Sequence, residues 1–337
     1  MNYNIFFTKY IKKSFQRSWM IVSEFFMKWR YWGGAYAIYS SAWWIAWYSP
    51  IPFRKMFWWG FRKKTNFLDD YIKNNYDDIL RKYKDIASSI SSDETLVVDY
   101  KIWFFWYQGL NSAPELVRKC YAEAVKYNGG AIVFLSKENI KEYIQIPDYI
   151  EEKLAAGIIS KTHYSDLLRV ALLAQYGGLW IDATSFTTEK IPDFIKTLNL
   201  YSIRKSDMPD IPLWANYRWC VYCLGTNAIN YSLFCFLRDM WLAYWKKEEY
   251  LIDYLFTDYL IYYAYNNFKA VQNDIDNIPV NNVHYNSLYF LLNKPYDDFT
   301  YQGIKQWFYK LSWKSYFTKY TADGKITFYG KLIDGDS

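Results

Sequence analysis

The 337-residue chain has few of the residues that mark several protein classes. Its 9 prolines and 14 glycines are too few for a collagen-like or low-complexity chain. Four cysteines in this length exclude a disulfide scaffold, and two histidines supply little toward a zinc site, which needs about four ligands. We therefore expect all four cysteines to be reduced structural thiols of a cytoplasmic protein. They are Cys120, Cys220, Cys223 and Cys235.

Apolar and aromatic residues are abundant instead. Hydrophobic residues make up 52% of the chain, which excludes a disordered protein because this content can bury a core. The length fits one large domain or two ordinary ones, and no internal repeat or linker divides the body. Aromatic residues reach 23%. They are favoured at sugar- and base-stacking sites and at membrane interfaces, since they combine an apolar face with a polar edge.

Charge is distributed unevenly along the chain. Residues 1–64 hold 11 lysines and arginines and one acid, Glu24, for a net charge of +10, whereas residues 65–337 carry −4. A nucleic-acid-binding body would spread basic residues over one face of the fold. We therefore expect no nucleic-acid partner.

Residues 31–53, inside this basic region, contain no charge and are rich in Trp and Tyr. The segment is long enough to span a bilayer, but Trp and Tyr prefer the headgroup region, and flanking basic residues attract anionic lipid. We interpret residues 1–64 as an interfacial membrane anchor. The alternative is an aromatic helical hairpin that packs on the body or on a second subunit of a homo-oligomer. No pattern of a secretory signal peptide is found.

The rest of the chain predicts an α/β fold. Residues 65–95 repeat apolar positions every three or four residues, which predicts connecting helices. Strand-like and helix-like segments then alternate, as is typical of an open, mostly parallel sheet. Residues 322–325 predict a hairpin turn. The expected strands are 96–98, 102–106, 131–135, 179–186 and 219–224, and the expected helices are 114–127, 136–143, 148–156, 160–176, 228–246 and 251–267.

The most informative stretch is residues 165–184. Asp166 and Arg169 are three residues apart, so they share one face of a helix, and a Gly-Gly pair leads from that helix into an apolar strand. Asp182 ends the strand, and ligands of open α/β sheets bind at the carboxyl ends of strands. Carboxylates there can hold Mg²⁺ or Mn²⁺, and an arginine can bind phosphate or sugar oxygens.

This stretch resembles the DXD-type sugar transferases with a GT-A fold, above all the bacterial capsular polysaccharide synthesis proteins. It is more distantly similar to the family 32 mannosyltransferases and to the large glucosylating toxins. In that group a helix with S-D-x-L-R is followed by G-G-x-x-x-D-x-D, as Ser165–Arg169 and Gly177–Thr184 are arranged here. The resemblance implies a catalytic domain over residues 96–337, with a nucleotide-sugar half at 96–190 and an acceptor half at 191–337.

The resemblance also implies roles for individual residues. Asp166 and Arg169 would hold the donor sugar as catalytic residues, next to the glycine pair Gly177 and Gly178. Asp182 would bind the ribose and, with Thr184, a Mn²⁺ or Mg²⁺ ion. Thr184 departs from the second Asp of the D-x-D pattern, so lysine and arginine are the alternative means of neutralising the diphosphate.

Other segments match the group more weakly. By this resemblance Trp106 stacks on the nucleotide base, and Gly109 lets the backbone approach it. Lys310 and Trp313 match a C-terminal segment that closes over the diphosphate. Asp258 is the candidate acceptor base if the reaction inverts the anomeric configuration, although the broader relatives retain it.

We therefore expect a glycosyltransferase at the cytoplasmic face of the cell membrane. It would transfer a sugar from a nucleotide sugar to a capsular or surface polysaccharide acceptor, which we expect to be lipid-linked. Two alternatives are a sugar-phosphate transferase of capsule synthesis and a catalytically silent membrane scaffold of a capsule-assembly complex.

Overall fold

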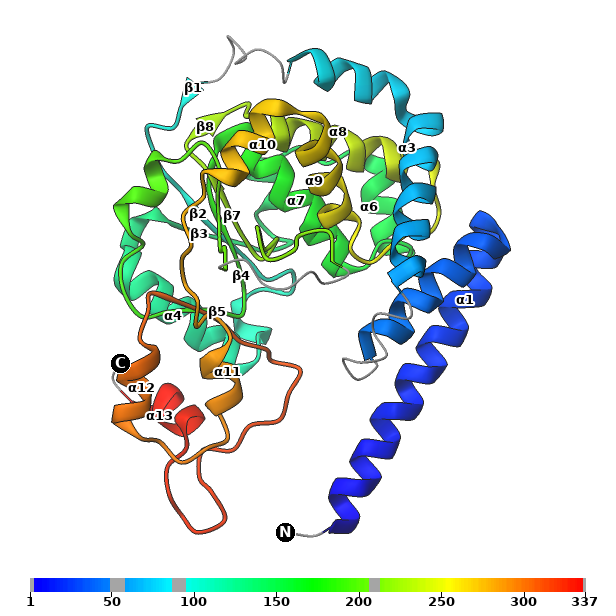
Figure 1. Cartoon of the computed structure of the whole chain (residues 1–337). Coiled ribbons are helices and arrows are strands. Elements are labelled where there is room, and N and C mark those ends of the chain that lie inside the picture. The colour runs from blue at the N-terminus through cyan, green and yellow to red at the C-terminus, as the bar shows by residue number, and fades with distance from the viewer. Residues whose placement is uncertain (1–2, 49–57, 87–94, 206–212, 336–337) are drawn as a thin grey trace.

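The computed structural model describes residues 3–48, 58–86, 95–205 and 213–335. At its centre lies a five-stranded sheet in the order β3-β2-β4-β7-β6 (Figure 1). The strands are β2 (Ile102–Phe105), β3 (Ile132–Leu135), β4 (Gly178–Asp182), β6 (Tyr201–Ser202) and β7 (Cys223–Thr226). β2 pairs in parallel with β3 and β4, whereas β7 runs antiparallel to β4 and β6. Four of the five strands therefore share one direction, which confirms the predicted mostly parallel sheet.

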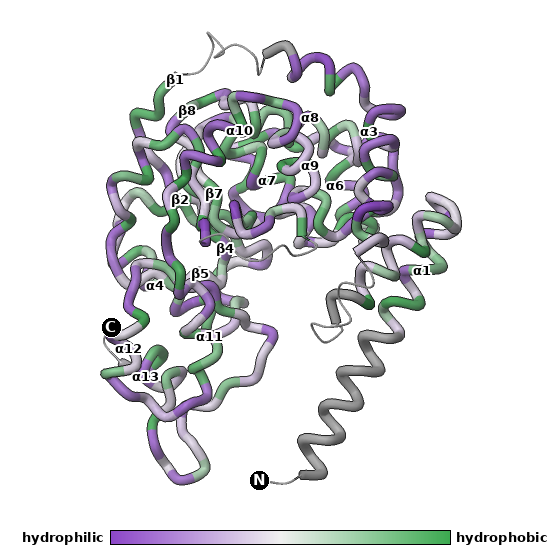
Figure 2. Tube along the Cα trace, viewed as in Figure 1, coloured by the Kyte–Doolittle hydropathy of each residue, from purple (hydrophilic) through white to green (hydrophobic). Residues whose placement is uncertain are grey.

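Both faces of the sheet are buried. In β2, Trp103 and Phe105 belong to one hydrophobic core, and Ile102 and Phe104 belong to the other. Strands that are apolar on both sides need cover on both faces, which helices supply. Figure 2 shows hydrophobic colour gathered in and around the sheet, with hydrophilic colour along much of the outer helix α3.

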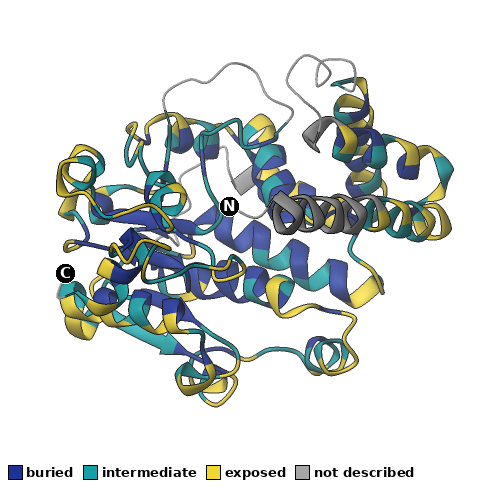
Figure 3. Ribbon diagram, turned by 90° about the horizontal axis from the view of Figure 1, so that it is seen from below, coloured by how far each residue is buried: buried dark blue, intermediate teal, exposed yellow. Residues whose placement is uncertain are grey.

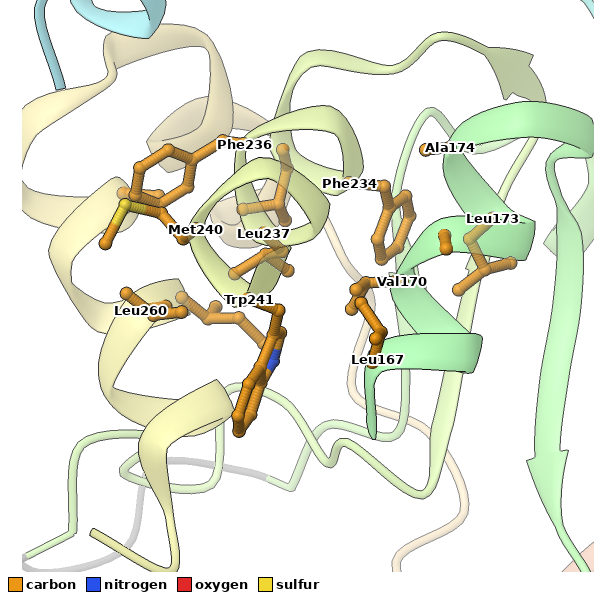
Figure 4. Close-up of a cluster of buried hydrophobic side chains, with 14 of the residues drawn as sticks. Leu167, Val170, Leu173, Ala174, Phe234, Phe236, Leu237, Met240, Trp241 and Leu260 are labelled. Atoms are coloured by element: carbon orange, nitrogen blue, oxygen red, sulfur yellow. The ribbon is translucent and has the colours of Figure 1, made fainter. Parts of the chain in front are cut away.

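The first face is covered by a layer of helices. Figure 4 shows Leu167 and Val170 of α7 close to Phe234 and Trp241 of α8, with Leu260 of α9 on the far side of α8. This layer contains α3 (Trp58–Ile86), α6 (Asp148–Ala155), α7 (Lys161–Tyr176), α8 (Ser232–Lys247), α9 (Phe256–Asn267) and α10 (Lys269–Asp276). Because α7 is packed inside this layer, its position relative to β4, the strand that follows it, is fixed.

The second face is covered by α4 and by C-terminal elements. The small antiparallel sheet of β5 and β9 joins them to the central sheet: Ser185 pairs with Lys310, and Leu311 N donates to Thr184 O at 2.9 Å. The segment around Lys310 and Leu311 is thereby fixed beside the end of β4. These elements are α4 (Glu115–Asn128), β5 (Ser185–Thr187), α11 (Ser287–Leu291), α12 (Asp298–Ile304), β9 (Phe308–Lys310) and α13 (Phe328–Asp334).

The N-terminal helix α1 (Tyr3–Tyr48) is a hairpin. The chain reverses at Gly33, whose φ of 85° lies outside the helical region. The two arms run side by side, because Lys28 Nζ donates to Ser40 Oγ at 2.7 Å and Trp44 Nε1 donates to Glu24 at 3.2 Å. Figure 1 shows the first arm extending beyond the second, away from the body. A helical hairpin packed on the body was the alternative interpretation of residues 1–64; residues 49–57 of that region lie outside the described residues.

Several predicted strands differ from those observed. The expected strand 96–98 is β1 (Thr95–Leu96), which pairs with β8 (Ala228–Ile229) outside the central sheet. The expected strand 179–186 is two strands, β4 and β5, separated by the turn that carries Thr184. β7 begins four residues later than predicted, because Trp219 turns away from the sheet toward α9.

Helices follow the predictions more closely. α4, α6 and α7 lie within one residue of their expected ends, and Gly324, with φ of 81°, forms the expected turn. The helix predicted from Ser136 begins as α5 (Ile140–Tyr143), because the Asn139 side chain accepts from Ser136 N and donates to Phe134 O. The four cysteines are free thiols, as predicted.

Candidate active site

A cavity of about 530 Å³ opens at the carboxyl ends of β2 and β4. Its size is that of a small-molecule site, and its place is where open α/β sheets bind ligands. Five parts of the chain build it: the turn after β2, the first turns of α7, the end of β4, the loop before α9 and the segment that begins with Lys310 at the end of β9. The lining residues that bear on the argument are Trp106, Lys161, Ser165, Arg169, Trp180, Asp182, Thr184, Tyr254, Lys310, Trp313 and Lys314.

Arg169 joins the two predicted carboxylates. Its Nη1 donates to Asp166 Oδ1 at 2.6 Å, and its Nη2 donates to Asp182 Oδ1 at 3.0 Å. The guanidinium also lies 5.1 Å from the ring of Trp180, whose Nε1 donates to the same Asp182 oxygen at 3.0 Å. The buried helix α7 and the strand β4 thus aim three charges at one point, as the motif predicted.

The other carboxylate oxygen of Asp182 accepts a hydrogen bond from Lys310. Lys310 Nζ lies 2.8 Å from Asp182 Oδ2 and 2.8 Å from Thr184 Oγ1. The same ammonium lies 5.1 Å from the ring of Tyr222. Lys310 reaches this place because β9 pairs with β5, immediately after the end of β4.

These charges set the protonation of the two acids. Burial alone raises the pKa of Asp182, but Lys310 and Arg169 together hold that pKa below its usual value. Burial raises the pKa of Asp166 to about 6, even though Arg169 opposes the shift. Asp182 is therefore ionised at neutral pH, whereas the pKa of Asp166 lies closer to neutrality.

Local signals explain how α7 is placed. Ser160 caps the helix by accepting from His163 N at 3.2 Å. The helix ends at Gly177 and Gly178, whose positive φ values of 63° and 87° let the chain turn at once into β4. A Cβ on Gly178 would lie 2.2 Å from Lys101 O, so only glycine fits.

The same turn places the glycine pair away from the cavity. Gly177 and Gly178 stand at the start of β4, and Asp182 stands at its other end. Neither glycine lines the cavity. The structure shows them shaping the helix-to-strand turn, and their predicted contact with a nucleotide sugar stays a prediction.

Aromatic rings form one wall of the cavity. The rings of Trp106 and Trp313 meet edge to face with centroids 5.8 Å apart. Trp106 is half-buried, and its Nε1 has no hydrogen-bond partner among the described residues. Gly109, with φ of 81°, follows in the same turn but does not line the cavity. Trp106 and Trp313, both predicted site residues, are therefore brought together at one wall of the cavity.

Asp258 lies beside the cavity without lining it. Trp219 Nε1 donates to its Oδ1 at 3.1 Å, and Tyr254, one turn earlier in the chain, lines the cavity. Burial raises the pKa of Asp258 to about 7, with a further increase from Asp166. His163 packs against Tyr254, and burial lowers its pKa to about 4. Asp258, the predicted base, thus lies close to the cavity in the chain but is not among the residues that line it.

The residues at the end of β4 fit a divalent metal poorly. Mg²⁺ and Mn²⁺ prefer several oxygen ligands, yet Asp182 is the one carboxylate among the described residues that line the cavity. The two expected ligand atoms, Asp182 Oδ2 and Thr184 Oγ1, share the ammonium of Lys310. The described residues contain no group of three or more His, Cys, Asp or Glu that could hold a metal ion.

Comparison with known proteins identifies the family of the chain. Residues 59–332 match the family described as capsular polysaccharide synthesis protein. The chain belongs to this family. A stretch of 123 residues is also 28% identical to the O-glycosyltransferase braB of Annulohypoxylon truncatum, over 34% of this chain and 29% of that protein. The chain thus spans under a third of that relative's length. No solved structure gives a significant match.

The motifs of this family member include the residues at the centre of the cavity but not all of those at its rim. Lys161, Ser165 and Tyr254 line the cavity but were not predicted as site residues. Ser165 adjoins Asp166 within the motif, so its position carried a signal. No sequence pattern marks Lys161 or Tyr254 as a site residue. Their positions at the cavity depend on how α7 and the loop before α9 pack together. Tyr309, beside Lys310, is buried and donates to Ile304 O.

Proposed function

We propose that this protein is a glycosyltransferase that moves a sugar from a nucleotide sugar to a polysaccharide or lipid-linked oligosaccharide acceptor. Membership of the capsular polysaccharide synthesis family and the similarity to an O-glycosyltransferase support the class of reaction. The network of Arg169, Asp182 and Lys310 at the carboxyl edge of the sheet carries the proposal. It sits where the diphosphate of a donor would lie in an α/β sheet.

The charge of the cavity suits an anionic donor. Lys161, Arg169, Lys310 and Lys314 line it, against Asp182 as the acid among the described lining residues. An excess of fixed positive charge stabilises a leaving diphosphate most strongly as its negative charge develops. Trp106 lines the same cavity and offers an aromatic ring on which the nucleotide base can stack.

The transfer itself needs one bond made and one broken. The acceptor oxygen bonds to the anomeric carbon, and the bond from that carbon to the diphosphate breaks with its electron pair passing to the phosphate oxygen. In a retaining reaction the acceptor proton passes to the same leaving phosphate, so no carboxylate base is required. In an inverting reaction Asp258 is the candidate base, since its raised pKa lies near neutrality.

The N-terminal hairpin supports attachment to a membrane surface. Trp19, Val22, Phe26 and Trp29, on its first arm, are each more than half exposed and recur every three or four residues. Figure 3 shows exposed residues along the described part of this arm. Aromatic stripes on basic helices favour the headgroup region of anionic lipid. None of the described helices is both long and apolar enough to cross a membrane.

A binding screen tests the proposed function. Full-length protein is mixed with UDP, GDP, CDP or CMP and their common sugars, and its unfolding temperature is recorded. A ligand at 100 times its dissociation constant adds about 2.7 kcal/mol of apparent stability. We expect one nucleoside diphosphate to stand out. A folded sample that responds to none of them would contradict a nucleotide-sugar enzyme and favour the scaffold alternative.

Product analysis separates transfer of a sugar from transfer of a sugar phosphate. The donor identified in the screen is incubated with a membrane extract that contains acceptor lipid. We expect the nucleoside diphosphate as the second product and no phosphate between sugar and acceptor. With a nucleoside diphosphate sugar as donor, release of a nucleoside monophosphate would instead identify a sugar-phosphate transferase.

A further inference from the structure

The ammonium of Lys310 lies at the point where a divalent ion would sit. A metal bound by Asp182 and Thr184 must approach both oxygens to about 2.1 Å. Lys310 Nζ is 2.8 Å from each of the same two atoms, so the ammonium and the ion compete for one position. The second carboxylate that would favour the ion is absent at position 184, where a neutral hydroxyl stands.

The surroundings hold Lys310 in this place. Its backbone is anchored on both sides: Lys310 N donates to Tyr285 O at 2.6 Å, and Leu311 N donates to Thr184 O at 2.9 Å. The pairing of β9 with β5 fixes the strand from which the side chain projects. Because its backbone is held in this way, Lys310 presents its ammonium group to the site as a fixed positive charge.

Lys310 also keeps a donor for a ligand. An ammonium group has three N–H donors. Two of them are directed to Asp182 Oδ2 and Thr184 Oγ1, and Lys310 itself lines the cavity. The third is available to a phosphate oxygen, which would then lie between Lys310 and the Arg169 side of the cavity.

We propose that Lys310 is the fixed cation that binds the donor diphosphate in place of a divalent metal ion, so that diphosphate binding is independent of Mg²⁺ and Mn²⁺. This inference rests on the proposed function, because it takes the ligand to be a nucleoside diphosphate. Asp182 then serves to hold Lys310 and Arg169 in position, one with each carboxylate oxygen. Thr184 accepts from the lysine where a carboxylate would have attracted an ion.

Calorimetric titration of inorganic pyrophosphate, UDP, GDP and CDP into the full-length protein tests this. Each titration is run in EDTA and again with Mn²⁺. We expect a nucleoside diphosphate to bind with the same affinity, within about twofold, in both buffers. Electron paramagnetic resonance of added Mn²⁺ gives an independent readout, with no protein-bound ion expected whether the nucleotide is present or not.

Two substitutions sharpen the test. Lys310→Ala removes the charge and is expected to weaken pyrophosphate binding at least about tenfold, the usual scale of a charge-assisted hydrogen bond. Lys305→Ala is the matched control, since Lys305 is an exposed lysine that pairs with Glu189 at 3.5 Å before β9. Its affinity should equal that of the unmodified protein.

A double variant is designed to replace the lysine ammonium by a metal ion. Thr184→Asp with Lys310→Ala supplies a second carboxylate and vacates the cation position, so this variant should bind Mn²⁺ and need it for diphosphate binding. Diphosphate binding by the unmodified protein that requires Mn²⁺ overturns the inference alone. Failure of all four diphosphates to bind, with and without Mn²⁺, overturns the proposed function and the inference with it.

Discussion

Lys64 Nζ lies 2.6 Å from Asp253 Oδ2, and both side chains are fully enclosed by the protein. The ammonium is also sandwiched between two indole rings, 3.8 Å from the centroid of Trp43 and 4.6 Å from that of Trp214. Lys64 belongs to α3, and Asp253 adjoins Tyr254 of the cavity wall. This ion pair therefore ties α3 to the rim of the candidate active site, and the contact of Lys64 with Trp43 adds the second arm of the hairpin α1.

Loss of this pair is expected to be costly. Lys64→Ala leaves the Asp253 carboxylate buried without its main partner, which costs about 3–5 kcal/mol of unfolding free energy. Lys82→Ala is the matched control on the same helix, because its pair with Asp239 is exposed and contributes about 1 kcal/mol or less. Urea unfolding measures both. Equal losses for the two variants would show that the buried pair is not formed.

Arg169→Lys is expected to weaken nucleoside diphosphate binding about 10- to 100-fold. A lysine cannot donate to Asp166 and Asp182 in the planar geometry that the guanidinium provides, so the cavity loses one charge-assisted hydrogen bond and the orientation of Asp182. Calorimetric titration measures the effect. Arg81→Lys serves as control, since Arg81 is an exposed α3 residue paired with Asp77 and Asp78. An unchanged affinity for Arg169→Lys would remove Arg169 from the binding site.

Trp106→Ala separates base binding from phosphate binding. Stacking of a base on an aromatic ring contributes about 1–3 kcal/mol, so the variant should bind the preferred nucleoside diphosphate at least about fivefold more weakly. Its affinity for inorganic pyrophosphate should not change, because that probe has no base. Trp59→Ala, on α3, should alter neither affinity. Equal losses for both ligands in Trp106→Ala would indicate a disturbed cavity instead of a lost stacking partner.

Asp258 predicts a pH-dependent stability. Burial raises its pKa to about 7 in the folded protein, whereas the unfolded chain has the ordinary value near 3.8. The folded state therefore holds the proton more tightly, and this stabilisation is complete below about pH 4 and lost progressively up to about pH 7. Asp258→Asn has no such loss and keeps an acceptor for Trp219. Relative to the unmodified protein it should gain stability between pH 5 and pH 8 in urea unfolding. A constant difference across this range would place the pKa of Asp258 at its ordinary value.

The centre of the candidate site could be read from the sequence because its signals are local. Ser160, Arg169 and Gly177 fix where α7 begins, which face it presents and where it ends, and Asp182 follows within one strand. Although the resemblance named Lys310 as a site residue, no local signal places it beside Asp182. It meets Asp182 across 128 residues of sequence through the pairing of β5 with β9, and no short-range pattern sets that register.

Errors elsewhere have similar causes. Apolar periodicity identified α7, but the separation of β4 from β5 depends on a turn at Thr184 that tertiary contacts with Leu311 support. The glycine pair lies outside the cavity lining, which the motif could not show, because a motif gives the spacing of residues but not their position relative to a cavity. Its members stand five and four residues before Asp182, at the opposite end of the same strand.

The exposed stripe on the first arm of α1 predicts binding to anionic membranes. Replacing Trp19, Phe26 and Trp29 together by Ser removes the apolar contact and leaves the basic residues of the arm in place. We expect the variant to sediment with vesicles of anionic lipid at least about tenfold less than the unmodified protein.

The matched control removes apolar surface elsewhere. Leu96→Ser with Val98→Ser alters two exposed residues in and just after β1, which Figure 1 places at the opposite end of the molecule from the tip of the first arm. Vesicle binding of this control should be unchanged. Binding of the unmodified protein should also fall as salt is raised, because the attraction of Lys and Arg to anionic headgroups is screened. If the α1 variant binds vesicles as well as the control does, the stripe faces a second protein chain instead, and the oligomeric state of the two variants becomes the distinguishing measurement.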